Sequence, residues 1–315
     1  MTLPAEFARI ERHFRPLAGP GSLDLTDDAA VFTPPPGREL VIAADAMVEG
    51  VHFLPEDPPG LVGRKLLRTN LSDLAAMGAA PLGYLMTVSV PKATPNAWFA
   101  AFAAGLALDQ IEFGLTLLGG DTTSTPGPIT LSLTIIGTVS PGHALRRNGA
   151  RAGDSIWVTG TIGDGALGLL AATGQLADST GYLADRYRLP QPRLRLVPHG
   201  IAHAAMDVSD GLVQDLGHLC RASGLSAVIH AESVPLSGAA RLADRLELCL
   251  TGGDDYELLL AVPPAHEAAL LDAARAARMQ VTRIGHFVAG EAAVTVLDRD
   301  GVAMDFATGG WSHFA

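Results

Sequence analysis

The sequence predicts an α/β protein in which two domains each combine helices with mixed sheets. The length of 315 residues fits two domains of about 150 residues each. Strand-like and helix-like segments alternate in both halves of the chain. Segment 140–149 is rich in Pro, Gly, Asn and basic residues without apolar periodicity, as expected of a linker. We therefore expect one domain at 1–139 and a second at 150–315.

In the first half, apolar spacing and terminal residues predict three helices. Phe7, Ile10 and Phe14 have helical spacing, and the second helix has Pro near its start and Gly78 as its stop. The helices are expected over 4–14, 59–78 and 95–112, and strands over 29–33, 39–45, 82–90, 115–119 and 129–139.

The second half repeats this mixture. Short runs rich in β-branched and other apolar residues predict strands, and longer periodic runs predict helices. The strands are expected over 155–159, 206–208, 226–230, 257–262, 280–284 and 293–297, and the helices over 164–173, 193–203, 210–222 and 264–278.

Composition excludes several classes of protein. The chain has 22 Lys plus Arg against 33 Asp plus Glu, a net charge of −11, which argues against a nucleic-acid partner. Cys220 and Cys249 form neither a metal-binding pair nor a disulfide framework, which favours a reduced, cytoplasmic setting. The N-terminus lacks a signal-peptide core, and the longest apolar run, 98–108, is too short to cross a bilayer. No membrane partner is therefore expected.

The chain contains only two Lys, Lys65 and Lys92, and neither belongs to a phosphate-binding loop of the G-x-x-x-x-G-K-[ST] type. The acidic residues, in contrast, gather in six short segments. Each alone is an ordinary turn or helix cap. The segments are T-D-D-A-A (26–30), A-A-D-A-M-V-E-G-V-H-F (43–53), N-L-S-D-L-A-A-M-G-A (70–79), G-G-D-T-T (119–123), M-D-V-S-D-G-L (206–212) and T-G-G-D-D-Y-E-L (251–258).

Three of these carboxylates stand out. Asp73 lies inside a predicted helix among small apolar residues, and Asp121 follows an apolar strand and two Gly. Asp210, with Gly211, would open a helix whose free N–H groups suit a phosphate, although a plain N-cap is the alternative. Because Mg²⁺ prefers hard oxygen ligands and often bridges carboxylates to phosphates, the pattern predicts a Mg–nucleotide site built on Asp.

Taken together, these segments resemble the thiamine-monophosphate kinase family, within the superfamily of aminoimidazole-ribonucleotide-synthetase-like ATP enzymes. The resemblance extends from about residue 5 to the final W-S-H-F. It implies an N-terminal domain that binds ATP and dimerises through its sheet, and a C-terminal α/β domain. It also implies a cytoplasmic homodimer that phosphorylates thiamine monophosphate to thiamine diphosphate with ATP and several Mg²⁺ ions.

Family roles carry over only to matching residues. The resemblance implies Mg²⁺ ligands at Asp28, Asp45, Asp73, Asp121, Asp207 and Asp210. It implies ATP contacts at Gly120, Asp121, Arg147 and Ser209, and substrate contacts at His52, Asp254 and Trp311. Relatives often carry hydroxyl residues where this chain has Ala43 and Ala44, so a ligand there would be a backbone carbonyl or water.

The implied reaction requires no general base, because a phosphate monoester has a second pKa of about 6 and is largely a dianion at neutral pH. Mg²⁺ and Arg147 would then supply the positive charge, and neither Lys would be essential. Simpler roles remain open: Arg147 as a solvated linker residue, and Trp311 as a core anchor. So do two other functions, a superfamily enzyme that phosphorylates an amide or carbonyl oxygen and a non-catalytic nucleotide-binding protein.

Overall fold

The computed structural model describes residues 5–313, and the chain divides into two units. Unit 1 runs to Leu74 and from Ala79 to Pro141, whereas unit 2 holds Ala75–Gly78 and continues from Gly142. Each unit has its own mixed sheet and its own helices, which confirms the predicted α/β class.

The sheet of unit 1 has the strand order β1-β4-β2-β3, so β1 and β3 form its two edges. Strand β4 is antiparallel to β1 and β2, whereas β2 and β3 are parallel and are connected through a helix. The strands are β1 (Glu39–Val48), β2 (Ala80–Val90), β3 (Thr116–Ser124) and β4 (Thr130–Val139). Strand β3 is longer than expected and continues through Asp121.

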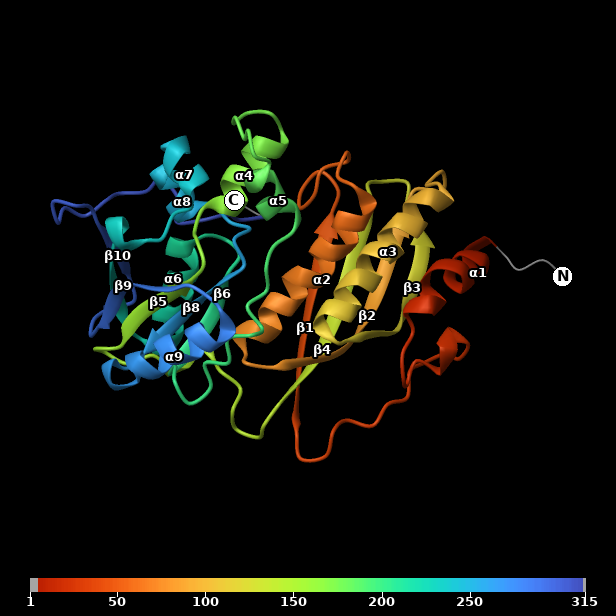
Figure 1. Cartoon of the computed structure of the whole chain (residues 1–315), viewed down its shortest axis with the longest axis horizontal. Coiled ribbons are helices and arrows are strands. Elements are labelled where there is room, and N and C mark those ends of the chain that lie inside the picture. Colours follow the sequence, from red (N-terminus) through yellow and green to blue (C-terminus); the bar gives the residue numbers. More distant parts are fainter. Residues whose placement is uncertain (1–4, 314–315) are drawn as a thin grey trace. The chain divides into compact units, whose positions relative to one another are not determined.

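Helices α2 (Pro59–Ala76) and α3 (Asn96–Phe113) cover one face of this sheet (Figure 1). Alternate residues of β4, such as Leu133 and Ile135, lie beneath these helices and are fully buried. The opposite face carries exposed apolar side chains next to Thr and Ser: Ile42 is 60% and Leu85 39% accessible, and Leu85 is in register with Thr134. Helices therefore cover one face of the sheet and leave the other exposed, although both faces carry apolar side chains.

The N-terminal segment contains less regular structure than predicted. Helix α1 (Ala5–Arg9) and a π-helical turn (Ile10–Phe14) account for the expected helix 4–14, of which residue 4 lies outside the described residues. The strand expected over 29–33 is wrong. Val31 is 70% exposed, and its N–H donates to the carbonyl of Gly21 rather than to a strand.

Unit 2 is built on a six-stranded sheet of order β10-β7-β9-β5-β8-β6, with β6 and β10 at its edges. The strands are β5 (Ser155–Thr159), β6 (Ala204–Val208), β7 (Ser226–His230), β8 (Glu257–Val262), β9 (Val281–Val288) and β10 (Val294–Leu297). Helix α6 (Leu212–Ser223) packs on one face and helix α9 (Glu267–Ala277) on the other. Strands β5, β6 and β8 are consequently buried on both faces.

Four shorter helices complete unit 2: α4 (Asp164–Ala172), α5 (Tyr182–Arg188), α7 (Gly238–Ala243) and α8 (Leu246–Thr251). The helix expected over 193–203 is wrong, because this segment forms turns and Pro198 in its middle lacks the N–H that a helix interior needs. The helix expected over 210–222 begins two residues later, at Leu212.

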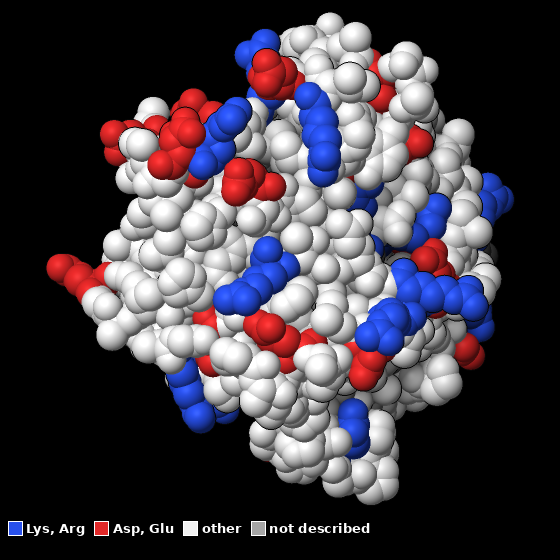
Figure 2. Space-filling model, turned by 60° about the vertical axis from the view of Figure 1, so that its left-hand side comes forward, with Lys and Arg blue, Asp and Glu red and all other residues white. Residues whose placement is uncertain are grey.

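Charged side chains of both signs are interspersed on the face shown in Figure 2, and wide areas of uncharged surface lie between groups of them. This distribution gives that face no continuous basic field of the kind that tracks a nucleic-acid backbone. Within residues 5–313, no helix has the length and apolar composition needed to cross a membrane.

Close contact between α2 and α3 generates a first prediction. A Cβ on Gly105 of α3 would collide with the carbonyl oxygen of Gly60 on α2, so Gly105→Ala should force the helices apart. We expect a destabilisation of about 1–3 kcal/mol in denaturant unfolding. Gly238→Ala is the control, because a Cβ on Gly238 meets no heavy atom within 4 Å. Equal stability of the two variants would contradict the packing.

Candidate functional site

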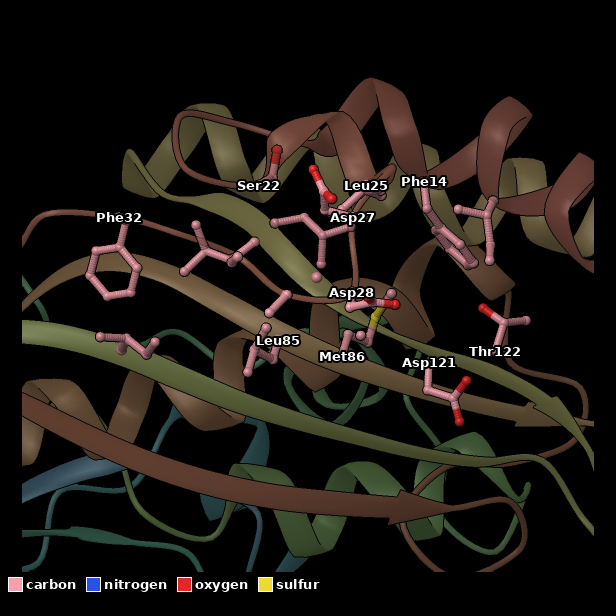
Figure 3. Close-up of a pocket in the computed structure, with 18 residues that line it drawn as sticks. Phe14, Ser22, Leu25, Asp27, Asp28, Phe32, Leu85, Met86, Asp121 and Thr122 are labelled. Carbon is pink, nitrogen blue, oxygen red and sulfur yellow. The ribbon is translucent and has the colours of Figure 1, made fainter.

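A pocket of about 510 Å³ lies at the β3 edge of unit 1 and is lined by two of the predicted acidic residues, Asp28 and Asp121, and by Asp27. Figure 3 shows Asp27 and Asp28 on the segment that passes over the sheet, and Asp121 on the sheet itself. Apolar side chains such as Phe14 and Met86 form much of the remaining wall. Asp28, Gly120 and Asp121, predicted separately, therefore share one pocket.

Gly120 adopts a backbone conformation that an ordinary residue avoids, with φ at 155°. A Cβ at this position would collide with the carbonyl of Met86 on β2. The glycine thus lets β3 stay paired with β2 beside a register shift at Tyr84/Leu85. The neighbouring strand is therefore sufficient reason for glycine at this position.

At the other edge of the sheet, β1 carries Asp45. The backbone N–H of Asp45 donates to Oδ1 of Asn70, at 3.1 Å, and Asn70 is a fully buried residue of α2. Its Nδ2 donates to the carbonyl of Leu66, which fixes the amide orientation. Asp73 follows Asn70 by three residues and so lies one turn further along the same side of α2. Asp45 and Asp73 form a second acidic group.

The two acidic groups are separated by the full width of the sheet. Asp45 is in register with Leu133, Leu133 with Met86, and Met86 with Gly120. Three strand spacings of about 4.8 Å place Asp45 about 14 Å from the start of the Gly120–Asp121 pair. Because Mg²⁺ binds oxygen at about 2.0–2.1 Å, one ion cannot bind Asp45 and Asp121 of the same chain.

His52 lies in the turn after β1, and a buried lysine supports that turn. Nδ1 of His52 accepts the N–H of Val48 at 3.0 Å. Lys65, on α2 and only 2% exposed, donates through Nζ to the carbonyl oxygen of His52 at 2.9 Å. The sequence reasoning missed this role, although a lysine beside Leu66 and Leu67 in an apolar helix was a signal for it.

In unit 2, the loop 208–211 connects β6 to α6. The N–H groups of Ser209, Asp210 and Gly211 all donate to Oδ2 of Asp215, at 3.0, 3.0 and 3.1 Å. The N–H groups of Asp210 and Gly211, which were expected to open the helix, are therefore already bound within the chain. Asp210 also makes no N-cap, because the cap residue is Gly211.

Asp207, at the end of β6, is buried beside this loop. Burial, and then the charges of Asp207 and Asp210, raise the pKa of Asp215 to about 7, while the N–H donors act in the opposite sense. Three carboxylates therefore gather around one short loop.

The carbonyl groups of loop 208–211 accept hydrogen bonds from two other segments, one at residues 254–256 and one at Trp311. The donors are backbone N–H groups, from Tyr256 to Val208, from Asp254 to Ser209 and from Trp311 to Asp210, at 2.8, 2.9 and 2.9 Å. The predicted ATP residue Ser209, the metal residue Asp210 and the substrate residues Asp254 and Trp311 are thus joined by main-chain hydrogen bonds.

Trp311 is held by its backbone rather than by its ring. Nε2 of Gln214 donates to the carbonyl of Trp311 at 2.7 Å and to Oδ2 of Asp210 at 3.1 Å. Gly310 permits this approach, because a Cβ there would collide with Gln214. The indole remains 54% exposed, which excludes the core-anchor interpretation of Trp311.

Arg147 begins a short 3₁₀ turn (Arg147–Gly149) and is exposed. Its carbonyl accepts the hydroxyl of Ser223 at the end of α6, at 2.9 Å. Burial, and then the charges of Arg221 and Arg147, lower the pKa of His218 on the same helix. Arg147 therefore lies near the side of α6 that faces Asp210, since it lowers the pKa of His218, and His218 and Asp210 have ligand atoms within 4.8 Å of each other.

A buried polar network supports the loops around Asp254. Asp255 is fully buried and accepts the N–H groups of Gly163 and Gly165, at 2.7 and 2.9 Å. Burial raises its pKa to about 8. Next to it, buried Glu257 accepts from Arg186 and Arg193. These residues were not predicted, because their role depends on contacts between distant segments.

The whole chain is similar to characterised proteins. Residues 26–139 match the family model of the AIR synthase related protein N-terminal domain, and residues 151–298 match that of the C-terminal domain. A thiamine-monophosphate kinase of Caulobacter vibrioides is 47% identical over 301 residues, which cover 91% of this chain and 85% of that protein.

Two solved structures agree with this similarity. Thiamine-monophosphate kinase from Stenotrophomonas maltophilia K279a has 40% identity and a TM-score of 0.81, covering 89% of this chain and 91% of that one. The structure described as AaThiL complexed with AMPPCP and TMP has 30% identity and a TM-score of 0.78, covering 91% of each chain.

The contact between Lys65 and His52 predicts different behaviour for the two lysines. Lys65→Met should loosen the turn after β1, because it removes a charge-assisted hydrogen bond of about 1.5–3 kcal/mol. We expect amide hydrogen exchange at residues 49–53 to accelerate by about tenfold or more. Lys92→Met, at an exposed position, is the control and should leave exchange unchanged. Equal exchange in both variants would restore the expectation that neither lysine matters.

Proposed function

The chain belongs to the thiamine-monophosphate kinase family of AIR synthase related proteins, and on this premise we propose that it phosphorylates thiamine monophosphate with ATP. The γ-phosphoryl group moves to the phosphate of the acceptor, a new P–O–P bond forms, and ADP leaves. Identity of 47% over nearly the whole chain carries the proposal. The related complex with AMPPCP, an ATP analogue, and TMP supports both substrates.

Magnesium ligation by the Asp residues fits the donor chemistry of the site. Exposed carboxylates of Asp28 and Asp121 line one pocket, and hard oxygen donors suit Mg²⁺. The proposed ligands are Asp28, Asp45, Asp73, Asp121, Asp207 and Asp210. When bound there, Mg²⁺ supplies the positive charge that neutralises and aligns the two phosphate groups.

The remaining residues bind and orient. Backbone hydrogen bonds hold loop 208–211 in one conformation, and the side chains of Ser209 and Asp210 contact the nucleotide. Arg147 adds a fixed positive charge near α6. His52 and Asp254 contact the thiamine substrate, and the exposed indole of Trp311 offers a face to its cationic thiazolium and flat pyrimidine. The acceptor phosphate is already a dianion, so no residue acts as a general base.

A homodimer formed through the sheet of unit 1 is part of the proposal. The exposed apolar face that includes Ile42 and Leu85 supports it, because two copies would bury this face. The separation of Asp45 from Asp121 supports it too. Joining the β1 edge of one chain to the β3 edge of its partner would bring the two acidic groups together. Buried free Cys220 and Cys249 support a reducing, cytoplasmic setting.

A turnover assay tests the activity. The purified chain with ATP, Mg²⁺ and thiamine monophosphate should form thiamine diphosphate and ADP in equal amounts. Unphosphorylated thiamine is the control acceptor and should give no product, since it lacks the dianionic nucleophile. ADP formation without thiamine diphosphate would point to a different acceptor and refute the proposal.

The metal assignment predicts the behaviour of two conservative variants. Asp121→Asn and Asp73→Asn keep shape but remove charge, so each should lower turnover at modest Mg²⁺ by about 100-fold or more. Turnover is measured across a Mg²⁺ series, with thermal melts to establish folding. Asp24→Asn is the control, because the side chain of Asp24 is 76% exposed and does not line the pocket. Near-normal turnover of both site variants would exclude them as ligands.

The exposed indole predicts a substrate-selective effect. Trp311→Ala should weaken binding of thiamine monophosphate by about 0.5–2 kcal/mol, up to about thirty-fold, and leave ATP binding nearly intact. Trp311→Phe should recover part of the loss, because it restores an aromatic face. Calorimetric titration of each ligand measures the effect. Normal binding of thiamine monophosphate by Trp311→Ala would remove this residue from the substrate site.

A further inference from the structure

Asp215 occupies an unusual position behind the proposed nucleotide residues. It is the fourth residue of α6 and is only 2% exposed. Its side chain turns back toward the start of the helix, where one oxygen, Oδ2, accepts three consecutive N–H groups from residues 209–211. A single carboxylate therefore fixes the direction of three successive peptide units.

The carbonyl groups of this loop also have hydrogen-bond partners. The carbonyl groups of Ser209 and Asp210 accept from Asp254 and Trp311, and that of Gly211 accepts the N–H of Asp215 at 2.9 Å. Buried backbone groups must find partners, and here each N–H and carbonyl of residues 209–211 has one. The side chains of Ser209 and Asp210 can still reach a ligand, although Oδ2 of Asp210 also accepts Nε2 of Gln214.

The chemistry of a carboxylate suits this task better than that of an amide. The N–H donors favour the ionised form of the Asp215 carboxyl, whereas its burial acts against that form. Hydrogen bonds to an ionised acceptor are roughly twice as strong as neutral ones. The three N–H groups also lie at the N-terminal end of α6, where the helix dipole favours negative charge. An Asn in the same place would still offer one acceptor oxygen but no charge, and an Ala would offer nothing.

We propose that Asp215 is a positioning residue for phosphoryl transfer: it holds loop 208–211 so that Ser209 and Asp210 present their side chains to the nucleotide and its metal. The inference rests on the proposed function, since it assigns how that site is kept in shape. Asp215 acts through the loop, because its Oδ2 faces the backbone of residues 209–211.

The test compares Asp215→Asn and Asp215→Ala with a matched control. Asp298 also accepts two backbone N–H groups through one oxygen, from Asp300 and Val302, at 2.9 and 2.8 Å. It follows β10, at the sheet edge opposite β6. Asp298→Asn should therefore perturb a turn to a similar degree without touching the site.

We expect kcat/KM for ATP to fall about tenfold in Asp215→Asn and further in Asp215→Ala, as loss of a charge-assisted bond predicts. Asp298→Asn should keep the kcat/KM of the parent chain. Amide exchange at residues 209–211 should accelerate in the same order, Asn then Ala. The partial rescue by Asn separates positioning from loss of folding, which thermal melts record for each variant.

Parent-like kcat/KM for ATP in both Asp215 variants would overturn the inference, as would a change no larger than that of Asp298→Asn. Failure of the proposed function is distinguishable, because the parent chain would then form no thiamine diphosphate. In that event calorimetric titration with AMPPCP and Mg²⁺, together with amide exchange, replaces turnover. Equal AMPPCP affinity and equal exchange in parent and variants would then refute the role of Asp215.

Discussion

Repulsion between negative charges is the constraint on which this structure depends. The chain carries a net charge of −11, and the proposed reaction brings two phosphate groups together among its carboxylates. Carboxylates close enough to share metal ions repel one another strongly when the metal is away. The fold meets this constraint in part by placing acidic residues on separate elements: Asp121 on β3, Asp45 on β1, Asp73 on α2 and Asp210 on a short loop. Where carboxylates do gather, as Asp207, Asp210 and Asp215 do, the pKa of Asp215 is raised.

Three buried polar residues next to the proposed site residues hold these elements in place. Asn70 fixes the backbone of Asp45, Lys65 fixes the turn of His52, and Asp215 fixes loop 208–211. Each is buried and bonded to backbone groups, so it adds rigidity without adding a charge to the ligand-facing surface. Polar residues thus have two roles in the proposed site: the carboxylates that we propose as ligands offer their oxygens, and buried side chains behind them fix the backbone that carries those oxygens.

The sequence predicted elements wherever one local pattern was enough. Helices α2 and α3 and strands such as β2 and β4 have clear periodicity and end signals, and all were found. Segment 29–33 has a strand composition but no strand partner, and 193–203 has helical spacing but a proline inside it. Motifs identified the acidic residues, yet not Lys65 or Asp215, since their roles follow from contacts across several residues or segments. For Asp215, the only local signal was a second Asp five residues after Asp210, close enough along the chain to bond the backbone before the helix.

Sheet geometry connects the charge constraint to assembly. Adjacent strands cannot approach closer than about 4.8 Å, so residues on edge strands of a four-stranded sheet stay about 14 Å apart whatever their side chains do. In unit 1 this fixed distance separates Asp45 from Asp121. If both bind the same phosphate-bound metals, as we propose, the second acidic group must come from another chain. The apolar face of the sheet then has a catalytic consequence: burying it against a partner would complete the site, and a separated chain would hold only half of each one.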